Sequence, residues 1–284
     1  MRIPLITYLA VILILDLFQE SLIFPGSRTQ GKSDAQVILP AGSELVPLQT
    51  AEGVKTVAVY GGALQSDGQP RADARTCPTL LFFYGNGTSL STALPLMEQF
   101  RRRGMNVMIP EYLGYGLAEG APSEIGCRAT AQAALAHLRT RGDIDRNRIV
   151  LAGTSLGGAV AIDLALRSDV AGLAVFSSFT SLPDVVRYQY PFLPGRWLLR
   201  HEFASRAKLA HLVNCPIFLA HGLDDEVVPH RMADELAASA SGPVQVQKVA
   251  GAGHNVFDVG GPELMDQVTK FVYACPPRSS VTRP

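Results

Sequence analysis

Hydrophobic positions in the central part of the chain form continuous runs separated by polar, glycine-rich segments. Residues 79–84 (TLLFFY) and 106–110 (NVMIP) are almost entirely apolar, and 170–178 (VAGLAVFSS) becomes polar only at its end. A strand buried on both faces has this pattern, because neither face needs polar side chains. We therefore expect these runs to be inner strands of a sheet that is covered on both sides.

Segments with helical spacing alternate with these strands. Residues 123–142 are the clearest, with Ser123 as N-cap, an alanine-rich centre, late arginines and a terminal glycine. Strands that alternate with helices of about 10–15 residues are typical of α/β proteins with a mainly parallel sheet. The same pattern predicts further strands at 148–153, 215–222 and 244–250, and further helices at 91–104, from Leu156, at about 230–239 and at 261–274.

Two regions depart from this alternation. Residues 35–62 contain short alternating runs between turn residues, which predicts antiparallel strands at the start of the sheet. Residues 179–213 form an irregular insertion that is rich in aromatic residues and prolines, and we interpret it as a small cap.

The first 24 residues form a separate hydrophobic segment, interrupted by Pro4 and Asp16. It is short for a membrane span, which needs about 20 apolar residues. It is long enough for the core of a signal peptide, but no convincing cleavage site follows. We favour an uncleaved N-terminal anchor, with a cleaved signal or a helix packed on the domain as alternatives. The expected location is therefore membrane-associated, or else exported or periplasmic.

The expected domain organisation follows from these segments. A polar linker at 25–36 separates the N-terminal segment 1–24 from one domain at 37–275, which contains the insertion, and a short tail at 276–284. Hydrophobic residues make up 47% of the chain and charged residues 18%, so a large core is available. The net charge is zero and no long basic run occurs, which argues against nucleic acid as a partner.

Cysteine usage gives no indication of a metal site. The four cysteines form no C-x-x-C pair, and no histidine lies at zinc-ligand spacing from them. We interpret them as buried thiols, with a disulfide as the alternative if the chain is exported. They are Cys77, Cys127, Cys215 and Cys275.

A G-x-S-x-G motif provides the first candidate for chemistry. Ser155 stands between Gly153 and Gly157, directly after a predicted strand and before a predicted helix. This context is the one that a nucleophile elbow requires, although a tight packing turn has the same glycines. The Leu156 N–H, at the helix N-terminus, would point at a developing oxyanion.

A serine nucleophile needs a base, and His254 is the best candidate. It lies in a glycine-rich loop, GAGHNVFD, after the last predicted strand, where a flexible loop can deliver it to the serine. The other histidines fit structural or surface roles better; they are His137, His201, His211, His221 and His230.

The base needs an orienting carboxylate, and the segment HGLDDEVVP supplies candidates. We favour Asp225, with Asp224 as the alternative, because two adjacent aspartates cannot both face the imidazole. Glu226 fits a capping role at the following helix, and Asp184 in the insertion is a poor alternative.

A second oxyanion donor is expected in the loop after strand 79–84. In YGNGTS two glycines open the backbone, so that the Asn86 N–H can face the same point as the Leu156 N–H. A plain Gly-Asn turn is the alternative interpretation.

Seven stretches in this order resemble one known family over nearly the whole chain. They are SLIFPGS, YGNGTS, PEYLGYGLAEGAPSE, GTSLGGAVA, FTSLPDVV with YPFLP, CPIFLAHGLDDEVVP and GAGHNVF. The chain resembles the α/β-hydrolase superfamily, and more narrowly small N-terminally membrane-anchored proteins related to serine aminopeptidase-like and depalmitoylating hydrolases. The resemblance implies an α/β fold with a mostly parallel eight-stranded sheet, flanking helices and a small cap.

The resemblance also implies roles for the candidate residues. It makes Ser155 the nucleophile, His254 the base and Asp225 the acid, in the chain order of α/β-hydrolases, with Asn86 and Leu156 as oxyanion donors. Two positions depart from the pattern. Tyr84 stands where relatives usually have His, so the support of the oxyanion loop must differ. Leu113 stands where relatives often have Arg, which affects the loop contacts near Tyr115.

The expected function is hydrolysis of an ester, thioester or amide with an apolar acyl group, without cofactor or metal. The substrate would be a small molecule or an acylated molecule, and the cap aromatics Tyr188, Phe192 and Trp197 are candidates to bind it. An aminopeptidase-like serine peptidase is one alternative and a non-catalytic, membrane-tethered binding protein is another. A peptidase would need an acidic subsite, for which the candidates are Glu111, Glu119 and Asp184.

Overall fold

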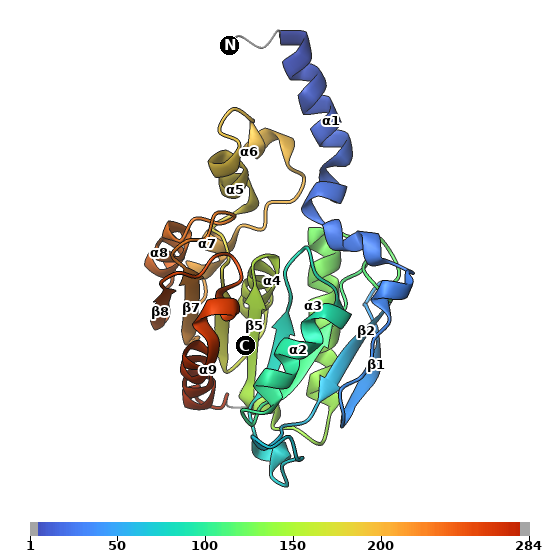
Figure 1. The fold of residues 1–284 in the computed structure, drawn as a ribbon, viewed down its shortest axis with the longest axis vertical. Coiled ribbons are helices and arrows are strands. Elements are labelled where there is room, and N and C mark those ends of the chain that lie inside the picture. The colour runs from blue at the N-terminus through green and yellow to red at the C-terminus, as the bar shows by residue number, and fades with distance from the viewer. Residues whose placement is uncertain (1–4, 279–284) are drawn as a thin grey trace.

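The computed structural model describes residues 5–278, except for the side chain of Asp34. Its centre is an eight-stranded sheet in the order β1-β2-β4-β3-β5-β6-β7-β8 (Figure 1). The pairs β1–β2 and β2–β4 are antiparallel, and all other neighbours are parallel. This topology confirms the predicted α/β-hydrolase fold with an antiparallel start. The strands are β1 (Ser43–Gln49), β2 (Lys55–Gly61), β3 (Thr79–Phe83), β4 (Asn106–Pro110), β5 (Ile149–Thr154), β6 (Gly172–Phe176), β7 (Ile217–Gly222) and β8 (Val244–Val249).

Helices cover both faces of this sheet, which is why its inner strands are continuous hydrophobic runs. Every residue of β3, β4, β6 and β7 is buried, whereas the edge strand β8 keeps a partly exposed face. Helices α2 and α9 lie on one face, and α3 and α4 on the other (Figure 1). The helices of the domain body are α2 (Leu90–Arg101), α3 (Glu124–Thr140), α4 (Leu156–Arg167), α8 (Arg231–Ser239) and α9 (Val256–Ala274).

Two of these helices illustrate the local signals in the sequence. Ser123 caps α3 as predicted, because its side chain accepts a hydrogen bond from the Gly126 N–H. The last helix begins at Val256, earlier than the predicted 261. Gly261 has a φ of 45°, so a kink at this glycine joins two helical segments where the Gly-Pro sequence indicates a single start.

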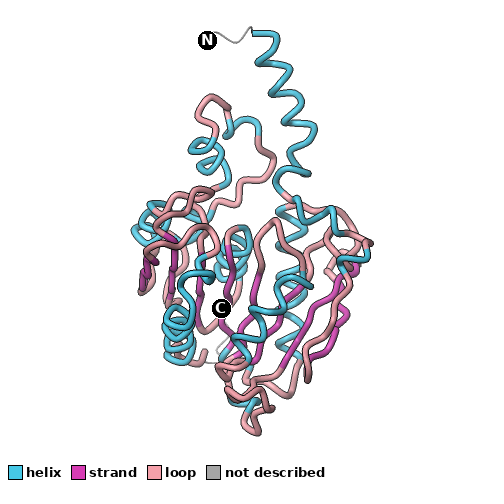
Figure 2. Tube along the Cα trace, viewed as in Figure 1, coloured by secondary structure: helices cyan, strands magenta, loops and turns pink. Residues whose placement is uncertain are grey.

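The insertion between β6 and β7 divides into two parts. Helices α5 (Leu182–Gln189) and α6 (Gly195–Leu198) project beyond the sheet, as Figure 2 shows, whereas α7 (Ser205–Leu209) packs on the body beside α4 and α8. We call residues 190–199, at the far end of the projecting part, the cap tip. Only part of the predicted cap therefore stands away from the domain.

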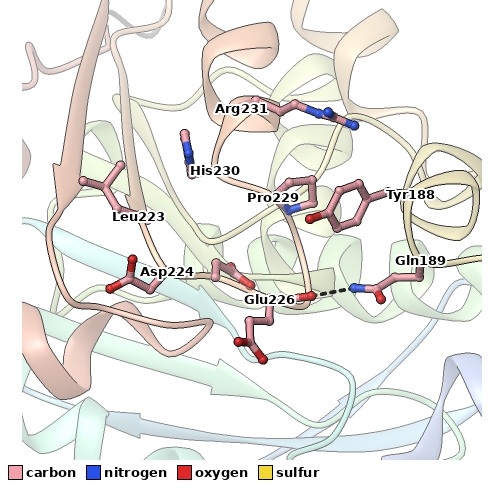
Figure 3. Close-up of a pocket in the computed structure, with 9 residues that line it drawn as sticks. Tyr188, Gln189, Leu223, Asp224, Glu226, Pro229, His230 and Arg231 are labelled. Carbon is pink, nitrogen blue, oxygen red and sulfur yellow. Dashed lines mark hydrogen bonds between the residues drawn. The ribbon is translucent and has the colours of Figure 1, made fainter.

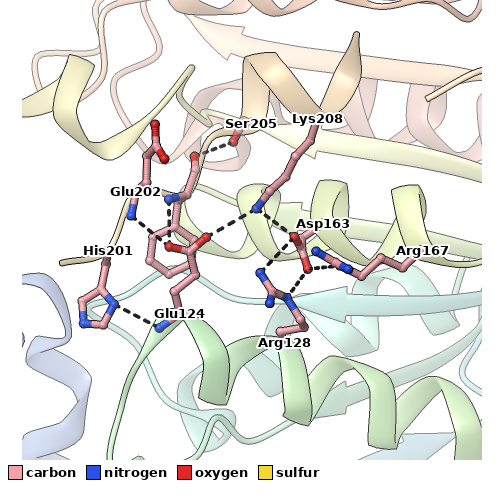
Figure 4. A network of polar contacts seen from close by, with 9 residues as sticks. Glu124, Arg128, Asp163, Arg167, His201, Glu202, Ser205 and Lys208 are labelled. Atoms are coloured by element: carbon pink, nitrogen blue, oxygen red, sulfur yellow. Dashed lines mark hydrogen bonds and ion pairs between the residues drawn. The ribbon is translucent and has the colours of Figure 1, made fainter. Parts of the chain in front are cut away.

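A network of ion pairs fixes the base of the insertion to the body (Figure 4). Asp163 of α4 contacts Arg128 and Lys208, each at 2.8 Å, and Arg167 at 3.1 Å. Glu124 accepts hydrogen bonds from the N–H of Glu202 and of Phe203, in the chain that leads down from the cap. Since Asp163 and Glu124 belong to α4 and α3, these contacts hold the base of the insertion in one position.

The N-terminal segment forms one long helix, α1 (Leu5–Ile23), which stands out from the domain (Figure 1). Of its side chains only Gln19 and Ile23 are buried. By length and composition α1 could cross a membrane, the one such helix within residues 5–278.

The segment expected to be a linker is folded against the domain. It contains two short 3-10 turns, Pro25–Thr29 and Ser33–Ala35. The Gly31 N–H donates to the Gly116 carbonyl, and the Gln30 side chain donates to the carbonyl of Ala118. Of the predicted tail, residues 279–284 lie outside the described part of the chain.

Candidate active site

Ser155 occupies a sharp turn between β5 and α4. Its backbone φ of 54° is positive, a conformation that residues other than glycine rarely adopt. The turn is possible because its neighbours are small: a Cβ at Gly153 would collide with the Gly157 carbonyl, and one at Gly157 with the Phe83 carbonyl. The Ser155 N–H donates to the Phe176 carbonyl at 2.8 Å. These contacts hold the serine hydroxyl at the carboxyl edge of the sheet.

The structure brings Ser155, His254 and Asp225 together from three separate loops. The His254 Nε2 lies 3.0 Å from the Ser155 Oγ, and the His254 Nδ1 lies 2.8 Å from the Asp225 Oδ2. The Asp225 side chain is fully buried, whereas that of His254 is 29% exposed. The hydroxyl, the imidazole and the carboxylate thus form a continuous chain of hydrogen bonds, in which a proton can pass from serine to histidine.

The surroundings of Asp225 keep its carboxylate ionised. Burial by itself raises the pKa of Asp225, but hydrogen bonds from His221, His254 and the Val228 N–H outweigh it and hold that pKa well below its ordinary value. The Asp225 Oδ1 accepts from the N–H groups of Val227 at 2.9 Å and Val228 at 2.8 Å. An anionic carboxylate is therefore available to orient the imidazole.

Asp224, the alternative carboxylate, lies elsewhere. Its side chain is exposed and lines a separate surface hollow together with Glu226, Pro229 and His230 (Figure 3). Residues 223 and 224 form a turn, and of the two aspartates only Asp225, whose side chain is buried, contacts His254.

His221 belongs to the site although the sequence analysis classed it as structural. Its Nε2 lies 3.0 Å from the Asp225 Oδ2 and 2.9 Å from the Val228 carbonyl oxygen, and its side chain is buried. Because both neighbours are acceptors, the Nε2 carries a hydrogen and donates. The available signal was its spacing, four residues before Asp225, at the end of the strand that precedes the loop.

The loop after β3 lies directly beside the serine. A Cβ built on Gly85 would stand 3.5 Å from the Ser155 Cβ. Asn86 lines the same cavity as Ser155 and His254, and Leu156 provides the first amide of α4. Within residues 5–278 neither the Asn86 N–H nor the Leu156 N–H donates to another protein group. Both amides therefore lie in the elements beside Ser155 without a protein acceptor in the described part of the chain.

Buried tyrosines support this loop where relatives were expected to use histidine. The Tyr84 hydroxyl donates to the Glu111 Oε1 at 2.5 Å, and the Tyr112 hydroxyl donates to the Tyr84 carbonyl at 2.9 Å. The Tyr115 hydroxyl donates to the Asn86 carbonyl at 3.1 Å. Burial raises the pKa of Glu111, and burial together with the Glu111 charge raises that of Tyr84.

The cavity at Ser155 has a volume of about 390 Å³ and one largely apolar wall. That wall comes from β3, α2 and the start of α9, and its members are Phe82, Ala93, Leu96 and Phe257. The sequence analysis assigned Phe82, Ala93 and Leu96 to a strand and a helix, and Phe257 to the loop of His254, because local hydrophobicity does not distinguish a core side chain from one that lines a cavity.

Comparison with known proteins agrees with this architecture. The profile of the alpha/beta hydrolase family matches residues 82–214. The alpha/beta hydrolase domain-containing protein WAV2 of Arabidopsis thaliana is 33% identical over 75% of this chain and 72% of its own. The chain belongs to the α/β-hydrolase family. This hydrolase is also 35% identical to an uncharacterised protein of Mycobacterium tuberculosis, over 82% of this chain and 77% of the other.

Among solved structures, the fold of this hydrolase is similar to that of the Pyrococcus furiosus esterase Pf2001. The TM-score is 0.67 at 17% identity, over 85% of this chain and 92% of the esterase. At this level of identity the similarity concerns the fold alone.

The structure does not bring the predicted substrate-binding aromatics of the hydrolase to the cavity at Ser155. Trp197 is 89% exposed and Phe192 59% exposed, both in the cap tip. Tyr188 lies under the Arg231 guanidinium and lines the hollow of Figure 3, where Gln189 donates to the Glu226 carbonyl. These aromatics lie elsewhere because α5 and α6 project outward instead of folding over Ser155.

The acidic residues that a peptidase would need are also absent from the lining of this cavity. Glu111 is fully buried beneath Tyr84, and Asp184 accepts a hydrogen bond from the Thr180 hydroxyl in the insertion. Glu119 is exposed and accepts from the Lys55 N–H. None of the three faces the Ser155 hydroxyl.

All four cysteines are buried, and no disulfide joins them in the described chain.

Proposed function

We propose that this α/β-hydrolase is a serine hydrolase that cleaves an ester, thioester or amide of an apolar acyl group. The observation that carries the proposal is the hydrogen-bond chain from the Ser155 Oγ through His254 to Asp225, with distances of 3.0 and 2.8 Å. Such an arrangement makes a serine hydroxyl nucleophilic at neutral pH.

In the proposed reaction Ser155 attacks the substrate carbonyl while His254 takes the hydroxyl proton. His254 then gives that proton to the leaving group, and an acyl-enzyme remains on Ser155. A water molecule, activated by His254 in the same way, releases the acid and regenerates the serine. Throughout, Asp225 accepts the hydrogen of the His254 Nδ1 and stabilises the imidazolium.

The free amides of Asn86 and Leu156 would stabilise the tetrahedral intermediate. Loss of one such donor costs about 3 kcal/mol in studied enzymes, so two donors account for a large share of the rate. The Tyr112 and Tyr115 hydroxyls under the loop support its shape, because they fix the Tyr84 and Asn86 carbonyls.

The apolar wall of the cavity supports an acyl group as the substrate moiety. Phe82, Leu96 and Phe257 provide hydrophobic surface next to the nucleophile, and no carboxylate faces it from the lining. This composition favours an uncharged hydrocarbon chain over the free amine that an aminopeptidase substrate carries.

A fluorophosphonate probe tests the chemistry, because it reacts only with activated serines. We expect one adduct on Ser155 in the wild type, and none in Ser155→Ala. His254→Ala is expected to lose labelling while keeping its folded structure by circular dichroism. A folded wild-type protein that takes up no label would contradict the proposal.

We also propose that α1 anchors the hydrolase in a membrane. The helix is long and apolar enough for this role, and its exposed side chains leave it without protein cover. Membrane fractionation with an alkaline wash, followed by the mass of the N-terminal peptide, tests the proposal. Retention of α1 in the washed membranes is expected, and recovery of soluble protein that lacks α1 would indicate a cleaved signal instead.

A further inference from the structure

Helix α1 presents apolar side chains in every direction. Leu13 and Ile14, and again Leu17 and Phe18, are consecutive pairs whose side chains are all more than half exposed. Neighbouring residues of a helix point about 100° apart, so these pairs cannot belong to one narrow stripe. A helix that is hydrophobic all round is normally buried in a protein core or in lipid, and α1 is not buried in this protein.

Four polar side chains of α1, those of Tyr8, Asp16, Gln19 and Glu20, contact the insertion. The Tyr8 hydroxyl donates to the Phe192 carbonyl at 2.8 Å. Asp16 pairs with Arg200 at 2.9 Å. The Gln19 side chain donates to the Leu198 carbonyl and accepts from the Arg200 N–H. Polar groups within a membrane helix are expected to face protein partners in this way.

The cap tip has the composition and the hydrogen bonding of a lipid-facing segment. Its sequence, YPFLPGRWLL, contains a single charged residue, Arg196. Two prolines lack an N–H, and most other amides donate to carbonyls of the insertion itself. Backbone groups in a bilayer must be satisfied inside the protein, and six of the eight amides of the cap tip are. The donating amides are those of Tyr190, Leu193, Gly195, Trp197, Leu198 and Leu199.

The cap tip runs alongside α1, because its Phe192 and Leu198 carbonyls accept hydrogen bonds from that helix. It also exposes aromatic side chains. Tyr8 and Gln19, which contact Phe192 and Leu198, are about 16 Å apart along the helix axis at 1.5 Å per residue. Trp197 lies next to Leu198, at the domain end of this contact. Trp197 is 89% exposed and Phe192 59% exposed, without a packing role in the domain.

We propose that the cap tip enters a phospholipid bilayer together with α1, as one embedded unit. Phe192 would lie among the acyl chains, and Trp197 near the headgroup boundary, where tryptophan is favoured and where Arg196 and Arg200 can reach phosphate. The all-round exposure of α1 favours lipid over a second copy of the chain, because a second copy would cover only one side of the helix.

This placement has a consequence for the active site. Helices α1, α5 and α6 project from the sheet edge that carries Ser155, so docking turns this edge toward the bilayer (Figure 1). A membrane-borne acyl substrate would then have a short path to the cavity. The docking rests on the proposed anchoring by α1, and only this consequence rests on the proposed hydrolase chemistry as well.

Trp197 is the one tryptophan of the chain and therefore a built-in probe. The experiment uses full-length protein in phosphatidylcholine vesicles whose acyl chains carry bromine, either near the headgroup or near the methyl end. We expect the Trp197 emission to be quenched most by bromine near the headgroup, and acrylamide quenching to fall several-fold relative to detergent. In Phe192→Trp/Trp197→Phe the deeper bromine should quench more strongly.

Ser66→Trp/Trp197→Phe is the matched control, because Ser66 is exposed in the loop that follows β2, and this loop lies at the end of the domain opposite α1 (Figure 1). We expect no bromine quenching in this variant. Unquenched Trp197 emission in vesicles that retain the protein would overturn the proposal, even with α1 anchored. Emission that shifts with protein concentration but not with bromine would assign the surface to a second copy. Fluorophosphonate labelling of the same samples reports on the hydrolase chemistry separately.

Discussion

The side-chain amide of Asn86 donates a hydrogen bond of 2.8 Å to the carbonyl oxygen of Ile23, the last residue of α1. The contact is reciprocal, since the Gly26 N–H donates to the Asn86 carbonyl at 3.0 Å. The last carbonyls of a helix lack partners within it, so Asn86 satisfies one of them. The loop that faces Ser155 is thereby attached directly to the end of the apolar N-terminal helix.

We expect Asn86→Ala to lower kcat about fivefold, because one hydrogen bond of about 1 kcal/mol no longer holds the loop. The backbone amide of residue 86 remains, so the effect reports on positioning. The measurement is hydrolysis of a short-chain ester. Asn147→Ala, at an exposed turn far from the site, is the control and should retain full activity. An unchanged kcat in Asn86→Ala would show that the attachment to α1 does not influence the loop.

Tyr84→Phe should lower the free energy of unfolding by roughly 1–3 kcal/mol, because the buried Glu111 carboxyl loses a hydrogen-bond donor. Urea denaturation measures this change. Tyr273→Phe is a matched control, since its hydroxyl also donates one hydrogen bond, to the Gly104 carbonyl, but at a partly exposed site. We expect the control to lose less. An equal decrease in the free energy of unfolding in both variants would mean that burial does not strengthen the Tyr84–Glu111 hydrogen bond.

The ionised state of Asp225 should make part of the stability depend on pH. Its pKa is lower in the folded protein than its ordinary value of 3.8, so its contribution is fully present above that value. The contribution is lost as the pH falls from there toward the lower folded pKa. The difference in urea midpoint between the wild type and Asp225→Asn should therefore shrink below about pH 4. A difference that stays constant down to about pH 2 would contradict the assignment.

Leu96→Trp should narrow the cavity at its apolar wall. We expect kcat/KM for a long-chain acyl reporter to fall about tenfold or more while that for an acetyl reporter changes little, because only the longer chain needs the filled space. Gln99→Trp, on the exposed side of the same helix, is the control. A parallel loss for both reporters would indicate that this wall does not hold the acyl chain.

The fold could be predicted in detail from local sequence. Strands such as β3 and β4 are continuous apolar runs because both of their faces are covered, and that requirement is visible in each segment separately. Ser155 and His254 were also recognisable, because glycines flank both in the chain. Gly153 and Gly157 allow the sharp turn at Ser155, and Gly251 and Gly253 form the loop before His254. The kink at Gly261 was less visible, since it depends on how two short helices pack.

The site required contacts between distant residues. The sequence alone left Asp224 as an alternative to Asp225, because only the path of the loop decides which carboxylate meets His254. It did not indicate that Glu111 lies under Tyr84, or that Asn86 meets Ile23, because these pairs are far apart in the chain. It also assigned the cap aromatics to the substrate, whereas the structure places Phe192 and Trp197 in the exposed cap tip and Tyr188 in a separate hollow beneath Arg231.

The sequence by itself determined the order of strands and helices, the turn at Ser155 and the hydrophobic nature of α1, because each depends on neighbouring residues. Only the tertiary structure decided which aspartate faces the imidazole, which side chains line the cavity and which surface the cap exposes. Those features depend on the directions in which side chains from separate loops point once the sheet has formed. No local pattern of hydrophobic and polar residues contains that information.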